Sequence, residues 1–101
     1  MISPGQGDGT PAKKVSFPLG KLVATPAAMQ AVPLEVIIGA LVRHGRGDWG
    51  NVGAEDWEAN QQALKNGGRL VSAYYTKDSG KFLIITEADR SLTTVLLPEE
   101  Y

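Results

Sequence analysis

The stretch from Arg69 to Leu97, RLVSAYYTKDSGKFLIITEADRSLTTVLL, limits the possible folds of this chain more than any other. It holds three runs rich in β-branched and aromatic residues, separated by turn-forming residues at Lys77–Gly80 and Ala88–Ser91. The run Phe82–Ile85 is apolar at every position, which predicts a central strand with both faces covered. We therefore expect an antiparallel three-stranded meander, with strands Arg69–Thr76, Lys81–Glu87 and Leu92–Leu97.

The segment before the meander carries the helix signals. Thr25-Pro26 is typical of a helix start, and Pro33 ends that short helix at about Ala31 and starts a second one. A third helix, from about Ala54 to Asn66, has a thin apolar face and should lie half exposed. Lys21–Ala24 is predicted to add a short fourth strand at a sheet edge. In the second helix a single apolar stripe with i, i+3, i+4, i+7 and i+8 spacing is predicted to pack flat on the sheet: Leu34, Ile37, Ile38, Leu41 and Val42.

These elements predict an α+β fold, with a small antiparallel sheet of three or four strands and two or three helices packed on one face. A chain of 101 residues is the size of one domain. Residues 1–16 are rich in glycine and proline and offer little to bury. We therefore predict a flexible tail over residues 1–16 and a single α+β domain over residues 17–101.

Composition excludes some classes of function. The net charge is −1, with ten basic and eleven acidic side chains, so no overall field draws the protein to nucleic acid or to an anionic membrane. The chain has no cysteine, which excludes disulfides, thiol catalysis and thiolate metal sites. No apolar run approaches the roughly 20 residues that span a bilayer, and no apolar signal core is evident at the amino terminus. We expect a cytoplasmic protein that does not act at a membrane.

The densest polar cluster lies in the glycine-rich loop RHGRGDWGNVG. A histidine can act as a general base near neutral pH, and arginines can hold a phosphate group. The alternative is structural: Asp48 caps the loop, Trp49 plugs the edge of the core and His44 is a last-turn helix residue. The structural alternative is favoured, because a single histidine without a fixed partner is a weak signal. The candidate residues here are Arg43, His44, Arg46, Asp48 and Trp49.

A second cluster lies at the turn between the last two predicted strands. Asp89 and Arg90 could form a recognition tip, or Glu87 and Asp89 could bind a divalent ion. The structural alternative is again favoured: Asp89 and Ser91 hydrogen-bond the turn and Arg90 pairs with an acid. Tyr74 and Tyr75 must face opposite sides of their strand, so one is expected in the core and the other at the surface.

The chain resembles a family of small, poorly characterised bacterial proteins labelled "plasmid-related", which are found on plasmids and integrative elements. The resemblance covers about four-fifths of the chain and omits the first sixteen residues. It implies a mobile-element context and a cytoplasmic location, and it supplies no mechanism. It is carried by FPLGKLVATPAAM, RHGRGDWG, LVSAYYT and IITEADRSLTTVLLPEEY.

The sequence therefore predicts a non-enzymatic binding or accessory protein of a mobile genetic element, without cofactor or metal. It would contact a protein partner through the Gly45–Gly53 loop and the Asp89-Arg90 turn. The alternative is a nucleic-acid-binding protein, or a small metal-free ribonuclease of toxin type using His44 with Arg46 and Arg90. That alternative requires the arginines at positions 43, 46, 69 and 90 to converge on one concave face. A homodimer could form through an edge strand, either Lys21–Ala24 or Leu92–Leu97.

Overall fold

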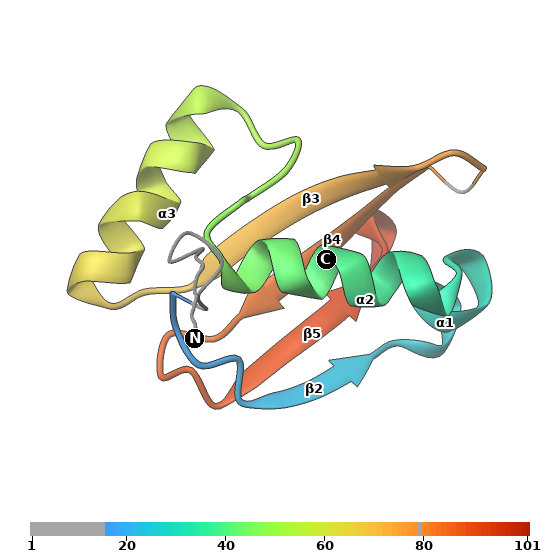
Figure 1. Ribbon diagram of the computed structural model, residues 1–101, viewed down its shortest axis with the longest axis horizontal. Helices are drawn as coiled ribbons and strands as arrows, with labels where there is room; N and C mark the ends of the chain where they lie inside the picture. Colours follow the sequence, from blue (N-terminus) through green and yellow to red (C-terminus); the bar gives the residue numbers. More distant parts are fainter. Residues whose placement is uncertain (1–15, 79) are drawn as a thin grey trace, which may run out of the picture.

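The computed structural model describes residues 16–78 and 80–101, so all of the predicted tail except Ser16 lies outside the described residues. Within them the predicted elements form in the predicted order (Figure 1). They are β2 (Lys21–Ala24), α1 (Pro26–Ala31), α2 (Leu34–Gly45), α3 (Ala54–Asn66), β3 (Leu70–Thr76), β4 (Gly80–Thr86), β5 (Leu92–Leu96) and the 3₁₀ turn η2 (Pro98–Glu100).

The sheet has four strands in the order β2-β5-β4-β3. The antiparallel meander is confirmed, and β4, whose residues 82–86 are buried, is a central strand. β2 lies at an edge as predicted, but it pairs in parallel with β5, with Lys21 opposite Leu92 and Ala24 opposite Val95. The sheet is therefore mixed rather than purely antiparallel. Because β5 lies between β2 and β4, the proposal that Leu92–Leu97 offers an edge to a second copy was wrong.

α1 and α2 cover one face of the sheet (Figure 1). Thr25 caps α1, its hydroxyl accepting a hydrogen bond from the amide of Ala28 at 3.1 Å. Buried apolar side chains from both helices pack on alternate residues of the strands and form the main core. This core consists of Ala28, Val32, Ile37, Ala40, Tyr74, Phe82, Ile84 and Val95.

The predicted stripe on α2 is only partly correct. Ile37 and Ala40 are buried and Leu41 is half-buried, but three members of the stripe face solvent. The helix is rotated about its axis so that the small Ala40 and the polar His44 also face the sheet. This rotation turns the far edge of the apolar stripe toward solvent. Those outward-facing residues are Leu34, Ile38 and Val42.

α3 does not pack flat on a sheet face; it lies beside β3 (Figure 1). Asn60, its one buried residue, uses its side-chain amide to donate to the carbonyl of Val71 at 2.9 Å and to accept from the Val71 amide at 3.1 Å. Further along the same edge, the Asn51 amide donates to the Ala73 carbonyl at 2.6 Å. The outer edge of β3 is thus covered, whereas no segment within residues 16–78 or 80–101 pairs with the outer edge of β2.

Candidate functional site

Trp49 is fully buried and belongs to the core. Its ring stacks on Phe17 with centroids 6.1 Å apart and meets His44 edge-on at 5.5 Å. Its indole Nε1 donates to Oε1 of Gln61 at 2.9 Å, which ties α3 to the core. The structural interpretation of Trp49 is therefore correct, and its side chain is not accessible to a ligand.

His44 lies in the last turn of α2, as the favoured structural alternative placed it, and it is fully buried. Nδ1 lies 2.5 Å from the hydroxyl of Ser72 on β3, and Nε2 lies 2.9 Å from the hydroxyl of Thr86 on β4. The chain of contacts continues from Thr86 to Thr93 at 2.7 Å, and from Thr93 to the carbonyl of Leu19 at 2.6 Å. Burial lowers the pKa of His44 to about 4, so the imidazole is neutral at pH 7.

This chain of hydrogen bonds fixes the tautomer of His44. The Leu19 carbonyl can only accept, so the single hydroxyl proton of Thr93 is donated to it. Thr86 must then donate to Thr93, and Nε2 of His44 must carry a proton to donate to Thr86. Nδ1 is left as the acceptor for the Ser72 hydroxyl. Both ring nitrogens are therefore occupied inside the fold, and the geometry offers no general base to a bound substrate.

Arg43 and Asp48 form an exposed ion pair that holds the loop. Arg43 donates from Nε to Asp48 at 2.8 Å and from Nη2 at 3.2 Å. These hydrogen bonds lower the pKa of Asp48 and raise that of Arg43. Asp48 also accepts from the Gly50 amide at 3.1 Å, and its carbonyl accepts from the Tyr74 hydroxyl at 2.7 Å. The predicted capping role of Asp48 is confirmed.

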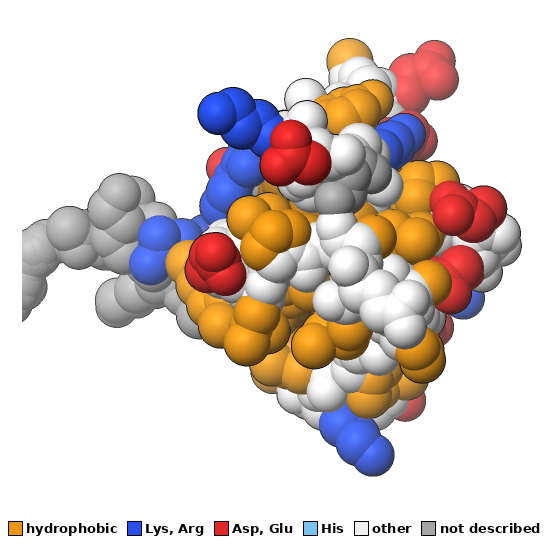
Figure 2. Space-filling view, turned by 90° about the vertical axis from the view of Figure 1, so that its right-hand side faces the viewer, with side chains coloured by type: hydrophobic (Ala, Val, Ile, Leu, Met, Phe, Trp, Pro, Cys, Tyr) orange, Lys and Arg blue, Asp and Glu red, His pale blue; other side chains and the backbone are white. Residues whose placement is uncertain are grey.

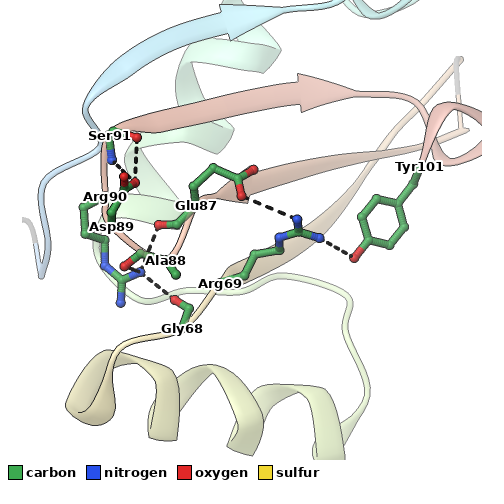
Figure 3. A network of polar contacts seen from close by, with 8 residues as sticks. All are labelled: Gly68, Arg69, Glu87, Ala88, Asp89, Arg90, Ser91 and Tyr101. Carbon is green, nitrogen blue, oxygen red and sulfur yellow. Dashed lines mark hydrogen bonds and ion pairs between the residues drawn. The ribbon is translucent and has the colours of Figure 1, made fainter.

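Arg90 links three parts of the chain rather than forming an outward tip (Figure 3). Nη1 donates to the carbonyl of Gly68 at 2.6 Å and to those of Glu87 and Ala88 at 3.2 Å. Nη2 donates to the Ala63 carbonyl near the carboxyl end of α3, at 3.0 Å. The guanidinium pairs with main-chain oxygens and not, as predicted, with an acid. It offsets the negative end of the helix dipole.

Asp89 stabilises the turn that holds Arg90. Its carboxylate accepts from the Ser91 amide at 3.0 Å and from the Ser91 hydroxyl at 2.6 Å, and these bonds lower its pKa. This confirms the structural alternative for Asp89. Arg90 itself has a φ of +64°, a left-handed conformation that is uncommon for a residue other than glycine.

Arg43, Arg69 and Arg90 contact different parts of the chain, and Arg46 lines a hollow that contains none of them. Arg43 pairs with Asp48 in the loop, and Arg90 points toward the end of α3. Arg69 reaches between Glu87 and the hydroxyl of Tyr101, at 3.4 Å from each (Figure 3). Within residues 16–78 and 80–101 no group of three histidine, aspartate or glutamate side chains is placed to hold a metal ion.

No protein-family model, curated protein or solved structure matches this chain. The plasmid-related resemblance therefore stays a prediction. In the described part of the chain, none of the helices is long and apolar enough to cross a membrane.

The surface that the sequence did not reveal is an apolar groove between α2 and β2, which we call the α2–β2 groove. It has a volume of about 360 Å³. The apolar stripe on α2 could have indicated this groove. Its five large apolar residues form a stripe wider than the contact that this helix makes with the sheet. The groove is lined by Leu19, Leu22, Ile38, Leu41, Val42, Gly45 and Arg46.

Several large apolar side chains in and beside this groove are about half exposed: Leu22 by 52%, Leu34 by 55%, Ile38 by 53% and Val42 by 43%. Met29 on α1 is 49% exposed. Figure 2 looks at the end of the molecule where α1 lies and shows hydrophobic side chains gathered over its lower part. Such a concentration of exposed apolar residues is typical of an interaction surface.

Two other hollows lie on the opposite face of the sheet, on either side of Arg69 and Tyr101, with volumes of about 310 and 270 Å³. The first contains Glu87 and Glu100 beside Arg69, and the second contains Asp56. Acids therefore accompany the arginine in each hollow, which weakens the attraction of either one for an anionic ligand.

Proposed function

We propose that this protein is a non-enzymatic binding protein that acts through a protein partner, and that the partner docks at the α2–β2 groove. The supporting observation is that Leu22, Ile38 and Val42, which line one groove, are about half exposed, as is Leu34 one turn earlier on α2. Of the residues first considered for binding, His44 and Trp49 lie in the core, and a further four hold the loops: Arg43, Asp48, Asp89 and Arg90. This moves the proposed surface from the Gly45–Gly53 loop and the Asp89-Arg90 turn to the outer side of α2.

The free energy available from covering these apolar side chains is of the size expected for a protein interface. Fully burying a large aliphatic side chain contributes about 1.5–3 kcal/mol, so covering four half-exposed ones contributes roughly 3–6 kcal/mol. Part of this gain is offset by the loss of translational and rotational freedom on association. A groove of this kind therefore supports moderate affinity, with Ile38 and Val42, which line it, as the anchors.

The setting of this activity is also part of the proposal. The plasmid-related resemblance suggests an accessory role for a mobile genetic element, carried out in the cytoplasm. The absence of cysteine is consistent with that compartment. The nucleic-acid alternative gains no support from the arrangement of the arginines or from the enclosed His44.

Affinity capture from the host with the tagged full chain tests this proposal. Ile38→Glu places a charge in the groove at an exposed helix position, where the fold should tolerate it. Tyr75→Glu is the matched control, because Tyr75 is 61% exposed on β3, which lies at the opposite edge of the sheet from β2. Each capture is repeated after nuclease treatment.

We expect a protein partner to be retained by the wild type and by Tyr75→Glu, with or without nuclease, and to be lost with Ile38→Glu. Retention by Ile38→Glu would exclude the α2–β2 groove as the binding surface. Loss of the partner on nuclease treatment would show that nucleic acid carries the interaction.

A further inference from the structure

We propose that the partner at this surface is a second copy of the same chain, and that two α2 helices pack against each other across a two-fold axis. This inference rests on the proposed function, since it names the occupant of the same surface. It is carried by the spacing of the exposed residues, by a glycine beside them, by the charges at the two ends of α2 and by the size of the surface.

The exposed residues of α2 form a ridge. Leu34, Ile38 and Val42 are four positions apart, so they follow one another along the helix and drift by only about 80° around its axis. Ridges with this i±4 spacing interlock in the commonest class of helix packing, with axes crossing at about −50°. The ridge is therefore suited to a second helix of the same kind.

Gly39 supplies a depression beside that ridge. It lies in the middle of α2, and a Cβ atom added there would meet nothing within 4 Å. Apart from proline, glycine is the least favourable residue in a helix interior, so the fold of the isolated chain gives no reason for it. In the dimer, the absent side chain lets the Ile38 side chain of the other copy approach the helix backbone.

The charges on α2 are self-complementary. Glu35 lies in the first turn, and Arg46 follows the last turn and lines the groove. A two-fold axis near Gly39 runs the two helices in opposite directions, so Glu35 of each copy approaches Arg46 of the other. The helix dipoles are also opposed in this arrangement.

The available surface fits a weak dimer. α2 has twelve residues and is about 18 Å long. Packed helices lie about 8–10 Å apart, so a face one helix wide and of this length covers on the order of 200 Å² per copy, and the adjoining groove adds to it. A standard stable interface buries about 800 Å² per partner, so we expect a reversible dimer with a Kd on the order of 10 μM.

Sedimentation velocity of the full chain from about 1 to 500 μM tests the dimer. We expect the wild type and Tyr75→Glu to pass from monomer to dimer over this range. Ile38→Glu and Gly39→Leu should each raise the Kd by about 100-fold or more. Gly39→Leu fills the depression with a better helix former, so its melting temperature at 1 μM should not fall below that of the wild type. Glu35→Lys should raise the Kd about 5-fold at low salt.

A wild type that stays monomeric at 500 μM would overturn the dimer. If a partner were still captured in an Ile38-dependent way, the proposed function would survive that result. A dimer that Gly39→Leu leaves intact would overturn the helix-to-helix geometry and indicate another contact, such as pairing of the two β2 edges.

Discussion

The buried neutral histidine makes the stability of this protein depend on pH in a way that can be calculated. His44 has a pKa of about 4 in the folded chain, because burial disfavours its charged form, against about 6.5 when unfolded. Below pH 6.5 the unfolded chain therefore binds a proton that the folded chain does not, and folding loses stability as the pH falls from about 6.5 toward 4. Below pH 4 both states are protonated and this loss is complete.

These two pKa values set the size of the effect. Between pH 7.5 and pH 5.5 the free energy of unfolding should fall by about 1.3 kcal/mol on account of His44 alone. With an m-value of about 1.3 kcal/mol/M, the urea midpoint should fall by about 1 M. His44 is the only histidine in the chain. Aspartate and glutamate side chains titrate mainly below this pH range, so the change between pH 7.5 and 5.5 should come mainly from His44.

Urea denaturation of the wild type and of His44→Gln at the two pH values measures the effect. Glutamine can still donate and accept but does not titrate, so its stability should be nearly constant between pH 7.5 and 5.5. The variant is expected to be less stable at pH 7.5, and the difference should narrow by about 1.3 kcal/mol at pH 5.5. An unchanged difference, or a histidine NMR titration near pH 6.5, would refute the reasoning about a buried neutral imidazole.

Three further predictions concern the contacts that hold the loops and edges. Arg90→Ala should lower the free energy of unfolding in urea by about 2–3 kcal/mol, because the main-chain oxygens lose their donor. Arg90→Gly should be about 1 kcal/mol more stable than Arg90→Ala, because glycine adopts a φ of +64° without strain. Equal stability of the two variants would argue against strain at this position. Asn60→Ala should lower the free energy of unfolding by about 2 kcal/mol, because it leaves the amide and carbonyl of Val71 unpaired. Gln62→Ala, at an exposed position of the same helix, should change it by no more than about 0.5 kcal/mol. Equal losses in urea denaturation would contradict the edge-capping role of Asn60. Gly50→Ala should lower the free energy of unfolding by about 3 kcal/mol or more, since Gly50 has a φ of +73° and an added Cβ would meet backbone and ring atoms. Gly53→Ala, with open space around it, should change the free energy of unfolding by no more than about 0.5 kcal/mol. Similar thermal unfolding midpoints for the two variants would contradict this prediction.

Local sequence signals predicted the elements well, because each depends on neighbouring residues. Thr25-Pro26 and Pro33 set the bounds of the first two helices, and the alternation of apolar and turn residues gave the meander. The adjacent tyrosines also divided as expected, with Tyr74 buried and Tyr75 exposed. Burial raises the pKa of Tyr74 to about 12.

Features that depend on distant parts of the chain were not predictable from local pattern. The parallel pairing of β2 with β5 joins segments from the two ends of the domain. The rotation of α2 depends on His44 finding hydroxyl partners on β3 and β4, which no periodicity of α2 reveals. The hydroxyls of Ser72 and Thr86 hold His44 in the core, where the sequence alone could not place it.

The parallel neighbour of β2 has a consequence for synthesis. Ala24 and Leu92 are 68 positions apart, and ribosomes add roughly 5–20 residues per second. β2 is therefore made about 3–14 s before β5, and α2, which ends at Gly45, about 2–9 s before it. During that interval α2 is available to chaperones, and truncation before residue 92 leaves β2 with no strand to join.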